Sequence, residues 1–178
     1  MNVRRYAGFV LLIPFAAACH RASRAGMIRS ATAEMRSVSG VRYGTLTLEP
    51  TAAGVRISGA LTSVPAGTHG LHFHQVGRCD APDFATAGGH LNPAGAQHGL
   101  ANQRGPHAGD LPNVAANAAG QMVVDIATPR VTLSSEGPIG VFDTDGTALV
   151  LHADRDDQRT DPAGNSGERI ACGVITRS

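Results

Sequence analysis

Two histidines stand two residues apart in residues 70–74, where apolar residues flank them. His72 and His74 are separated only by Phe73, and residues two apart on a β-strand point to the same side of the sheet. Two imidazoles on one face of a strand are half of a copper or zinc site. A surface or core pair without metal is at least as common. The pair alone therefore does not establish a metal site.

A long polar stretch supplies further candidate ligands. Residues 76–112 contain His90, His98, His107 and Asp110. Three imidazoles and one carboxylate make a tetrahedral zinc set, and neutral histidine is the commonest metal ligand. A loop of this length with little apolar content needs a cross-link to offset the entropy lost on ordering, and zinc would supply one. The alternative is a solvated polar loop without metal.

His152 completes a set of seven ligand candidates. It ends the apolar run 148–151 and opens a second long stretch, residues 153–169. At a strand end, it could reach a site shared with the first stretch. Long loops in a compact domain are functional or disordered. Because these two contain most of the candidate chemistry, we expect them to be functional.

The elements that must position these residues are short strands. Residues 41–49 and 55–60 alternate between apolar and polar side chains with the period of a half-buried strand, and Ala53-Gly54 forms the turn between them. Further strands are expected at residues 70–75, 115–118, 121–127, 147–152 and 170–175. The chain has 22 Gly and 10 Pro, and no long stretch has helical spacing. We therefore expect an all-β fold, a Greek-key antiparallel sandwich or barrel of about eight strands with two long functional loops.

The N-terminus is typical of an export signal. Arg4 and Arg5 precede an uncharged apolar run, residues 7–18, which ends in three alanines before Cys19. Small residues before a cysteine indicate a bacterial lipidation site, although position 16 has Ala where Leu is usual. Plain cleavage after Ala18 is the alternative. We expect a signal peptide at 1–18, a tether at 19–40 with a short helical patch at 31–35, and a folded domain at 41–178.

The net charge limits which partners the chain can bind, and the cysteines indicate the compartment. All 15 basic residues are Arg, and two of them lie in the signal, so the mature chain has 13 basic and 14 acidic residues, a formal charge of −1. This balance argues against nucleic acid as a partner. Membrane contact is expected only through a lipid on Cys19, in the periplasm or cell envelope. Cys79 and Cys172 remain as a pair, which an oxidising compartment favours as a disulfide over free thiols.

Several segments resemble the copper–zinc superoxide dismutases. Residues 68–74, Thr-His-Gly-Leu-His-Phe-His, are similar to the first signature of that family. Residues 88–93, 98–99 and 106–111 resemble its zinc loop, and residues 164–173 resemble its C-terminal signature. The motifs occur in family order, and the resemblance covers about residues 41–176.

This resemblance implies two metal ions and a set of assigned residues. Its copper ligands would be His72, His74, His90 and His152, and its zinc ligands His90, His98, His107 and Asp110. His90 would then bridge the two ions. Asp156, rather than the adjacent Asp157, would link His72 to His98, and Cys79 and Cys172 would form the family's disulfide. His69 would have no ligand role and would be a packed, hydrogen-bonded histidine beneath the copper site.

The same resemblance implies the dismutation of superoxide to dioxygen and hydrogen peroxide. The catalytic residues would be Arg169, which attracts the anion beside copper, and His90, which carries a proton. Arg169 could also hold loop carbonyls. Many eukaryotic members have Lys-Thr where this chain has Pro162-Ala163, so steering would fall to other residues, with Arg104, Arg155 and Arg159 as candidates.

Two other readings are a non-enzymatic copper-binding or copper-delivery protein on the same fold and a purely structural envelope lipoprotein. Loss of a copper ligand or of Arg169 would favour the first, but all are present. The second would make the ligand set a coincidence. The sequence leaves open whether two copies form a homodimer.

Overall fold

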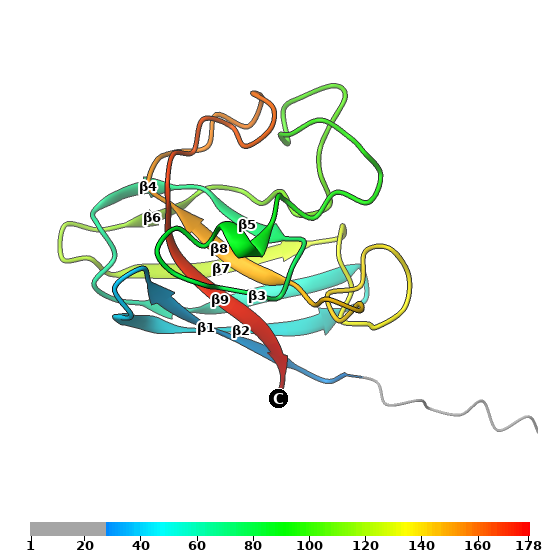
Figure 1. The fold of residues 1–178 in the computed structure, drawn as a ribbon, viewed down its shortest axis with the longest axis horizontal. Helices are drawn as coiled ribbons and strands as arrows, with labels where there is room; N and C mark the ends of the chain where they lie inside the picture. Colours follow the sequence, from blue (N-terminus) through cyan, green and yellow to red (C-terminus); the bar gives the residue numbers. More distant parts are fainter. Residues whose placement is uncertain (1–27) are drawn as a thin grey trace, which may run out of the picture.

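The computed structural model describes residues 28–178, which form one antiparallel sheet of nine strands (Figure 1). The only helical element in this part of the chain is a short 3-10 turn, η1 (Ala85–Ala87). The strands are β1 (Ala31–Ser37), β2 (Arg42–Thr51), β3 (Gly54–Leu61), β4 (Gly67–His69), β5 (Leu71–His74), β6 (Val114–Ala116), β7 (Met122–Thr128), β8 (Ala148–His152) and β9 (Arg169–Arg177). The predicted all-β antiparallel class is confirmed, with nine strands in place of about eight.

The sheet closes nearly on itself through a single glycine. Its strand order is β4-β6-β7-β3-β2-β1-β9-β8-β5, so β4 and β5 are its two edges. Those edges are consecutive in the chain and are joined by Gly70 alone, which requires the sheet to curl until they meet. A Cβ at Gly70 would lie 2.9 Å from a ring carbon of His72 and 3.1 Å from Cβ of Ser166. Only glycine fits this joint without a shift.

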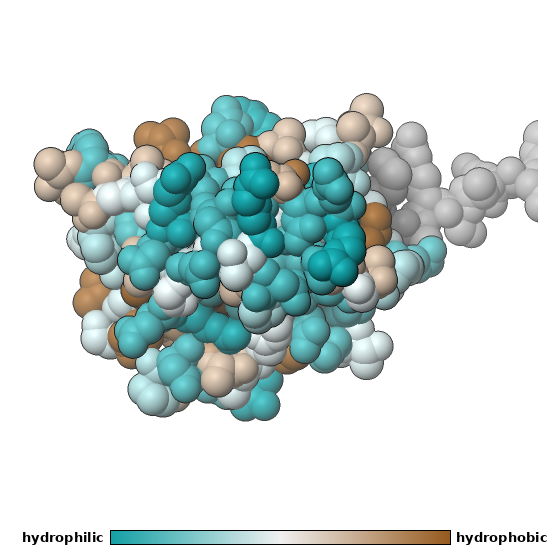
Figure 2. All heavy atoms as spheres, turned by 90° about the horizontal axis from the view of Figure 1, so that it is seen from above, coloured by the Kyte–Doolittle hydropathy of each residue, from teal (hydrophilic) through white to brown (hydrophobic). Residues whose placement is uncertain are grey.

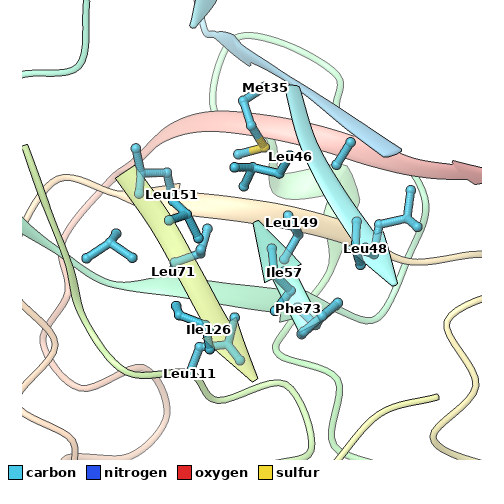
Figure 3. Close-up of a cluster of buried hydrophobic side chains, with 14 of the residues drawn as sticks. Met35, Leu46, Leu48, Ile57, Leu71, Phe73, Leu111, Ile126, Leu149 and Leu151 are labelled. Atoms are coloured by element: carbon cyan, nitrogen blue, oxygen red, sulfur yellow. The ribbon is translucent and has the colours of Figure 1, made fainter. Parts of the chain in front are cut away.

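The hydrophobic core fills the inside of the curled sheet. In β7 every second residue is buried, and β1 has the same alternation. Figure 3 shows the buried side chains converging from strands on different parts of the sheet. They include Met35, Leu46, Leu48, Ile57, Leu71, Phe73, Leu111, Ile126, Leu149 and Leu151. Burial of this apolar surface is the main favourable term for the fold.

The tether predicted for residues 19–40 is wrong over its last part. Residues 31–37, where we expected a short helical patch, form strand β1, which pairs with both β2 and β9. Its inward residues are Ala31, Ala33, Met35 and Ser37. Three of these four side chains are small, so the alternation is weak in the sequence although complete in the structure. The predicted signal peptide, Cys19 and the first part of the tether lie outside the described residues.

The two predicted long loops are present, and a third connection was not predicted. The first loop joins β5 to β6 and the second joins β8 to β9. Both extend beyond the same end of the sheet, in green and orange at the top of Figure 1. The third connection, between β7 and β8, spans residues 129–147 and contains a short bridge between Thr132 and Gly140. Within residues 28–178 no helix has the length and apolar character to cross a membrane.

A disulfide ties the first loop to the last strand. Cys79 lies in the first loop and Cys172 in β9, and the two are bonded across a sequence separation of 93 residues. For a closed loop of this size the chain-entropy model gives a stabilisation of about 4–5 kcal/mol before strain is subtracted. The pairing predicted from the sequence is therefore present, and it anchors the loop that contains most of the candidate ligands.

Candidate metal centre

Strand β5 presents two histidines on one side. All four residues of the strand are buried. Leu71 and Phe73 belong to the hydrophobic core, so His72 and His74 point the other way, towards the long loops. The alternation of a strand thus separates the core face from the polar face, as the sequence predicts.

Backbone contacts dock the first loop against β5. Leu91 donates its N–H to Phe73 O (2.8 Å), and Phe73 donates to Gly109 O (2.9 Å). A β-bridge pairs His74 with His90. A Cβ at Gly109 would collide with the Phe73 carbonyl oxygen, so the close approach requires glycine there. These contacts place loop ligands beside the two histidines of β5.

One group of ligand atoms has the spacing of a tetrahedral site. Oδ1 of Asp110 lies 3.0 Å from Nδ1 of His90, 3.0 Å from Nδ1 of His98 and 3.3 Å from Nδ1 of His107. Nδ1 of His107 lies 3.4 Å from Nδ1 of His90. Four ligand atoms placed tetrahedrally at zinc–ligand distances would be about 3.3 Å apart. All four residues are buried.

Asp110 is oriented by backbone donors. Its second oxygen, Oδ2, accepts hydrogen bonds from the N–H of Gly99 (2.8 Å) and of His107 (2.9 Å). Oδ1 is thereby turned towards the three imidazoles. Nδ1 of His98 is 3.0 Å from this oxygen yet makes no well-directed hydrogen bond to it. The two atoms are therefore close without pairing, as two ligands of one shared ion would be.

A second group contains four imidazoles whose ligand nitrogens lie within 4.8 Å of one another, those of His72, His74, His90 and His152. His74 donates from Nδ1 to Gly88 O (2.9 Å), and His152 donates from Nδ1 to Gly167 O (3.2 Å). Both Nε2 atoms are then unprotonated, and they face each other at 3.4 Å. Nδ1 of His72 and Nε2 of His90 are buried and have no hydrogen-bond partner in the described part of the chain.

His90 belongs to both groups. Its Nδ1 is 3.0 Å from Asp110 in the first group. Its Nε2 is the unpartnered nitrogen of the second group. One ring can therefore offer a nitrogen to each of two neighbouring ions.

Asp156 makes a second link between the groups. His72 donates from Nε2 to its Oδ2 (2.8 Å), and Nε2 of His98 lies 3.0 Å from both carboxylate oxygens. Each ring is thus held with its Nδ1 towards its own group. Asp156 is fully buried, whereas the adjacent Asp157 is exposed and accepts a hydrogen bond from Thr160. The structure therefore places Asp156, and not Asp157, in the linking position.

Two features were not predicted from the sequence. One is the side chain that holds Asp156, and the other is the pair of main-chain carbonyls that orient histidines. The side-chain amide of Asn113 accepts from Asp156 N (2.9 Å) and donates to Asp156 O (2.8 Å). The carbonyls of Gly88 and Gly167 orient His74 and His152. A backbone carbonyl has no sequence signal. Asn113 is an ordinary loop asparagine in the sequence.

Burial keeps the second group neutral. It lowers the pKa of His90 to about 4 and of His152 to about 3, and neighbouring histidines act in the same direction. The pKa of His74 also lies well below its usual value, chiefly because of burial. These rings are uncharged at neutral pH, so their lone pairs are free for a metal ion.

In the first group, the pKa of His98 is raised rather than lowered. Burial lowers the pKa of this ring, but the carboxylates of Asp110 and Asp156 outweigh burial and raise it to about 9. Burial raises the pKa of both carboxyl groups, yet their hydrogen bonds with histidines hold both pKa values well below the usual range. Without metal, His98 is therefore a cation between two carboxylates at neutral pH.

Arg169 lines a cavity beside the second group. This cavity of about 500 Å³ also exposes His74, His90 and His152. The guanidinium of Arg169 donates to Phe84 O (2.6 Å) and to Gly88 O (2.7 Å). Burial lowers its pKa, but an arginine stays charged in proteins. An anion that enters the cavity meets this fixed positive charge next to the imidazoles.

The surroundings of the cavity are polar. Figure 2 looks onto the end of the sheet covered by the long loops, and hydrophilic side chains dominate that face. The three arginines considered for steering, Arg104, Arg155 and Arg159, are exposed.

A larger cleft of about 890 Å³ shares only Gly167 and Arg169 with the cavity and is lined by none of the candidate ligands.

The remaining histidine in this region is His69, and it lies in neither group. Its ring nitrogens are 2.8 Å from His152 O and 2.9 Å from Pro65 O. This agrees with the expectation of a packed, hydrogen-bonded residue. The structure brings every other ligand predicted from the sequence into one of the two groups.

Comparison with known proteins identifies the family. A family model described as copper/zinc superoxide dismutase (SODC) matches residues 42–175. A superoxide dismutase [Cu-Zn] 1 of Aquifex aeolicus is 42% identical over 144 residues, which cover 80% of this chain and 85% of the relative. This chain belongs to the copper/zinc superoxide dismutase family. A Caulobacter vibrioides superoxide dismutase [Cu-Zn] is 40% identical over 148 residues, with 82% and 85% covered.

Two solved structures, one of a Cu/Zn superoxide dismutase and one of a SOD-like protein, share the fold. A Cu/Zn superoxide dismutase from Brucella abortus has a TM-score of 0.67 at 28% identity, covering 82% of this chain and 98% of that one. A SOD-like protein from Bacillus subtilis has a TM-score of 0.77 at 35% identity, covering 80% and 96%. The predicted enzyme class and the predicted cofactors, copper and zinc, are confirmed by the family.

The two ligand groups fit the two metals of a copper/zinc superoxide dismutase. A tetrahedral set of imidazoles with one carboxylate suits zinc, and four imidazole nitrogens suit copper(II). Three buried imidazole nitrogens lack partners within residues 28–178: Nδ1 of His72, Nε2 of His90 and Nδ1 of His98. Buried polar atoms are rarely left unpaired in native proteins. A metal ion in each group would satisfy all three.

The raised pKa of His98 predicts proton release on zinc binding. Zinc must displace the proton from Nδ1 of a ring that is charged below about pH 9. The affinity of the metal-free protein for zinc should therefore rise about tenfold per unit between pH 7 and 9 and then level off. Calorimetry in buffers of different ionisation enthalpy should count about one proton from His98. Copper binding, through rings that are already neutral, is the control. A zinc affinity that is flat from pH 7 to 9 would contradict the assigned charge of His98.

Proposed function

We propose that this chain disproportionates superoxide with copper held by His72, His74, His90 and His152, and zinc by His90, His98, His107 and Asp110. The observation that carries the assignment is the His90 ring, which offers one nitrogen to each group. A protein that only binds and delivers copper has no need for a ligand shared with a second, carboxylate-containing site. The relatives named above are superoxide dismutases, which supports the same reaction here.

The chemistry divides between the metal and the chain. Copper supplies one-electron exchange, so that one superoxide is oxidised to dioxygen and a second is reduced, with two protons, to hydrogen peroxide. Arg169 attracts the anion into the cavity and orients it beside the imidazoles. Nε2 of His90 has no hydrogen-bond partner within residues 28–178, so it can hold one of the two protons whenever it is not a copper ligand. Zinc on Nδ1 would fix the ring and tune its basicity.

We also propose that residues 1–18 direct export and that Cys19 carries a lipid, which places the domain in the cell envelope on the periplasmic side. The disulfide supports this compartment, because such bonds persist in oxidising environments. Mass spectrometry of unreduced protein from the envelope should find a lipid-modified Cys19 at the N-terminus and a linked Cys79–Cys172 peptide. An N-terminus before Cys19, or an unmodified Cys19, would contradict the anchor. Two free thiols would contradict the pairing.

The assignment of copper predicts the effect of His152→Ala. His152 lies outside the first group and makes no bridge, so its loss should remove most of the copper and nearly all dismutase activity while zinc stays near one per chain. Metal content by mass spectrometry and the decay of superoxide measure both effects. His69→Ala removes a contact to the His152 carbonyl but no ligand, so it shows how much of the effect comes from disturbing the backbone of His152. Retained copper with substantial activity in His152→Ala would overturn the ligand assignment.

The role of Arg169 predicts a change in salt dependence. Arg169→Glu should leave copper and zinc content unchanged and lower the second-order rate constant about tenfold or more, since local charge can change on-rates by about 10–10³. The wild-type rate should fall with ionic strength, and the Arg169→Glu rate should fall less or rise.

Arg169→Lys separates charge from loop anchoring. It keeps the charge but cannot hold Phe84 O and Gly88 O as a planar fork does, so it should keep the wild-type salt slope. Identical rates and slopes for the wild type and Arg169→Glu would show that Arg169 only ties down the loop.

A further inference from the structure

Arg130 reaches the first ligand group from the connection between β7 and β8. Its Nη2 donates to the main-chain carbonyl of Asp110 at 3.0 Å. The backbone around Arg130 is fixed, because its N–H donates to Thr128 Oγ1 (3.3 Å) and Val131 is fully buried. A residue 20 positions away in sequence is thereby attached to the only carboxylate in this group.

The contact is poorly explained as a simple stabiliser of the fold. The guanidinium is partly buried, its Nε is buried without a partner within residues 28–178, and it gains a single hydrogen bond to a neutral carbonyl. Burial lowers the pKa of Arg130, and the nearby Asp110 carboxylate acts in the opposite direction. Partial burial of a cation costs free energy, and one hydrogen bond to a neutral carbonyl offsets little of that cost. The position of this cation is better explained by what it holds.

Arg130 holds the backbone of Asp110. Other contacts also fix the position of this segment. Oδ2 of Asp110 is held by two N–H groups of its own loop. The next carbonyl, that of Leu111, accepts a hydrogen bond from Nε2 of Gln158 in the second loop (3.2 Å). Arg130 adds a contact from the third connection. Three separate segments therefore fix where Oδ1 lies relative to the imidazoles.

We propose that Arg130 is a positioning residue for the zinc site: by holding the Asp110 carbonyl, it places Oδ1 at the fourth corner of the tetrahedron. The inference rests on the zinc ligands assigned above. Outer partners that orient metal ligands change metal affinity by about 10–100-fold when they are removed. We expect a loss of that size at the zinc site and almost none at the copper site.

The test is Arg130→Met compared with Arg56→Met. Arg56 also carries one positive charge, but it pairs with exposed Asp125 on β3 and β7, away from both groups. In chelator competition, Arg130→Met should bind zinc at least tenfold more weakly than the wild type, while Arg56→Met stays within twofold. Cobalt(II) placed in the zinc site should give an altered visible spectrum in Arg130→Met, which reports ligand geometry rather than stability. Copper affinity should stay within twofold in both variants.

A double-mutant cycle separates positioning from general destabilisation. If Arg130 acts through Asp110, Arg130→Met should weaken zinc binding little further in an Asp110→Ala background. Equal losses in both backgrounds, or wild-type zinc affinity and cobalt spectrum in Arg130→Met, would overturn the proposal. If Arg130→Met does not fold, Arg130→Gln replaces it, with the same outcomes decisive. A wild-type protein that binds no cobalt or zinc at this site would instead contradict the ligand assignment itself.

Discussion

Two buried side chains, the ring of His90 and the carboxylate of Asp156, connect the two ligand groups. His90 links them through its own two nitrogens, and Asp156 links them through hydrogen bonds to His72 and His98. Neither group can be moved without disturbing the other. Because these polar atoms are buried, every one that lacks a partner costs free energy. The surrounding fold must therefore hold a dense set of imidazoles and carboxylates in one arrangement.

The fold meets this constraint by holding the two long loops in place beside strand β5. β5 is short, buried on both sides and paired with β8. The first loop docks on it through backbone bonds and a glycine that permits close approach. The second loop contributes Asp156, which Asn113 holds by both ends of its amide. The disulfide to β9 fixes the start of the first loop. Function thus lies on loops: the first is fastened to the sheet, and the second is fastened to the first through Asn113.

Much of the site could be predicted from the sequence because ligand chemistry is visible there. Histidine and aspartate are chemically distinctive, and their order matches a known family. The strands with strong alternation, such as β2 and β7, were predicted within a few residues. The residue-level metal assignments themselves stay predictions.

What could not be predicted depends on neighbours in space. β1 was missed because Ala31, Ala33 and Ser37 give little apolar signal, and its place becomes evident only between β2 and β9. Arg130 and Asn113 are ordinary residues in the sequence, and their roles come from reaching across to Asp110 and Asp156. Backbone carbonyls that orient histidines leave no trace in composition or spacing.

The position of β1 also matters for anyone who trims this protein. The family match begins at residue 42, which invites a shortened protein that starts there. Such a cut would remove an interior strand, leaving β2 and β9 each with an unpaired edge. Exposed edges are templates for pairing with other chains. A shortened form that begins before Ala31 keeps the sheet continuous, whereas one that begins at 42 is a candidate for strand exchange and aggregation even though every metal ligand is retained.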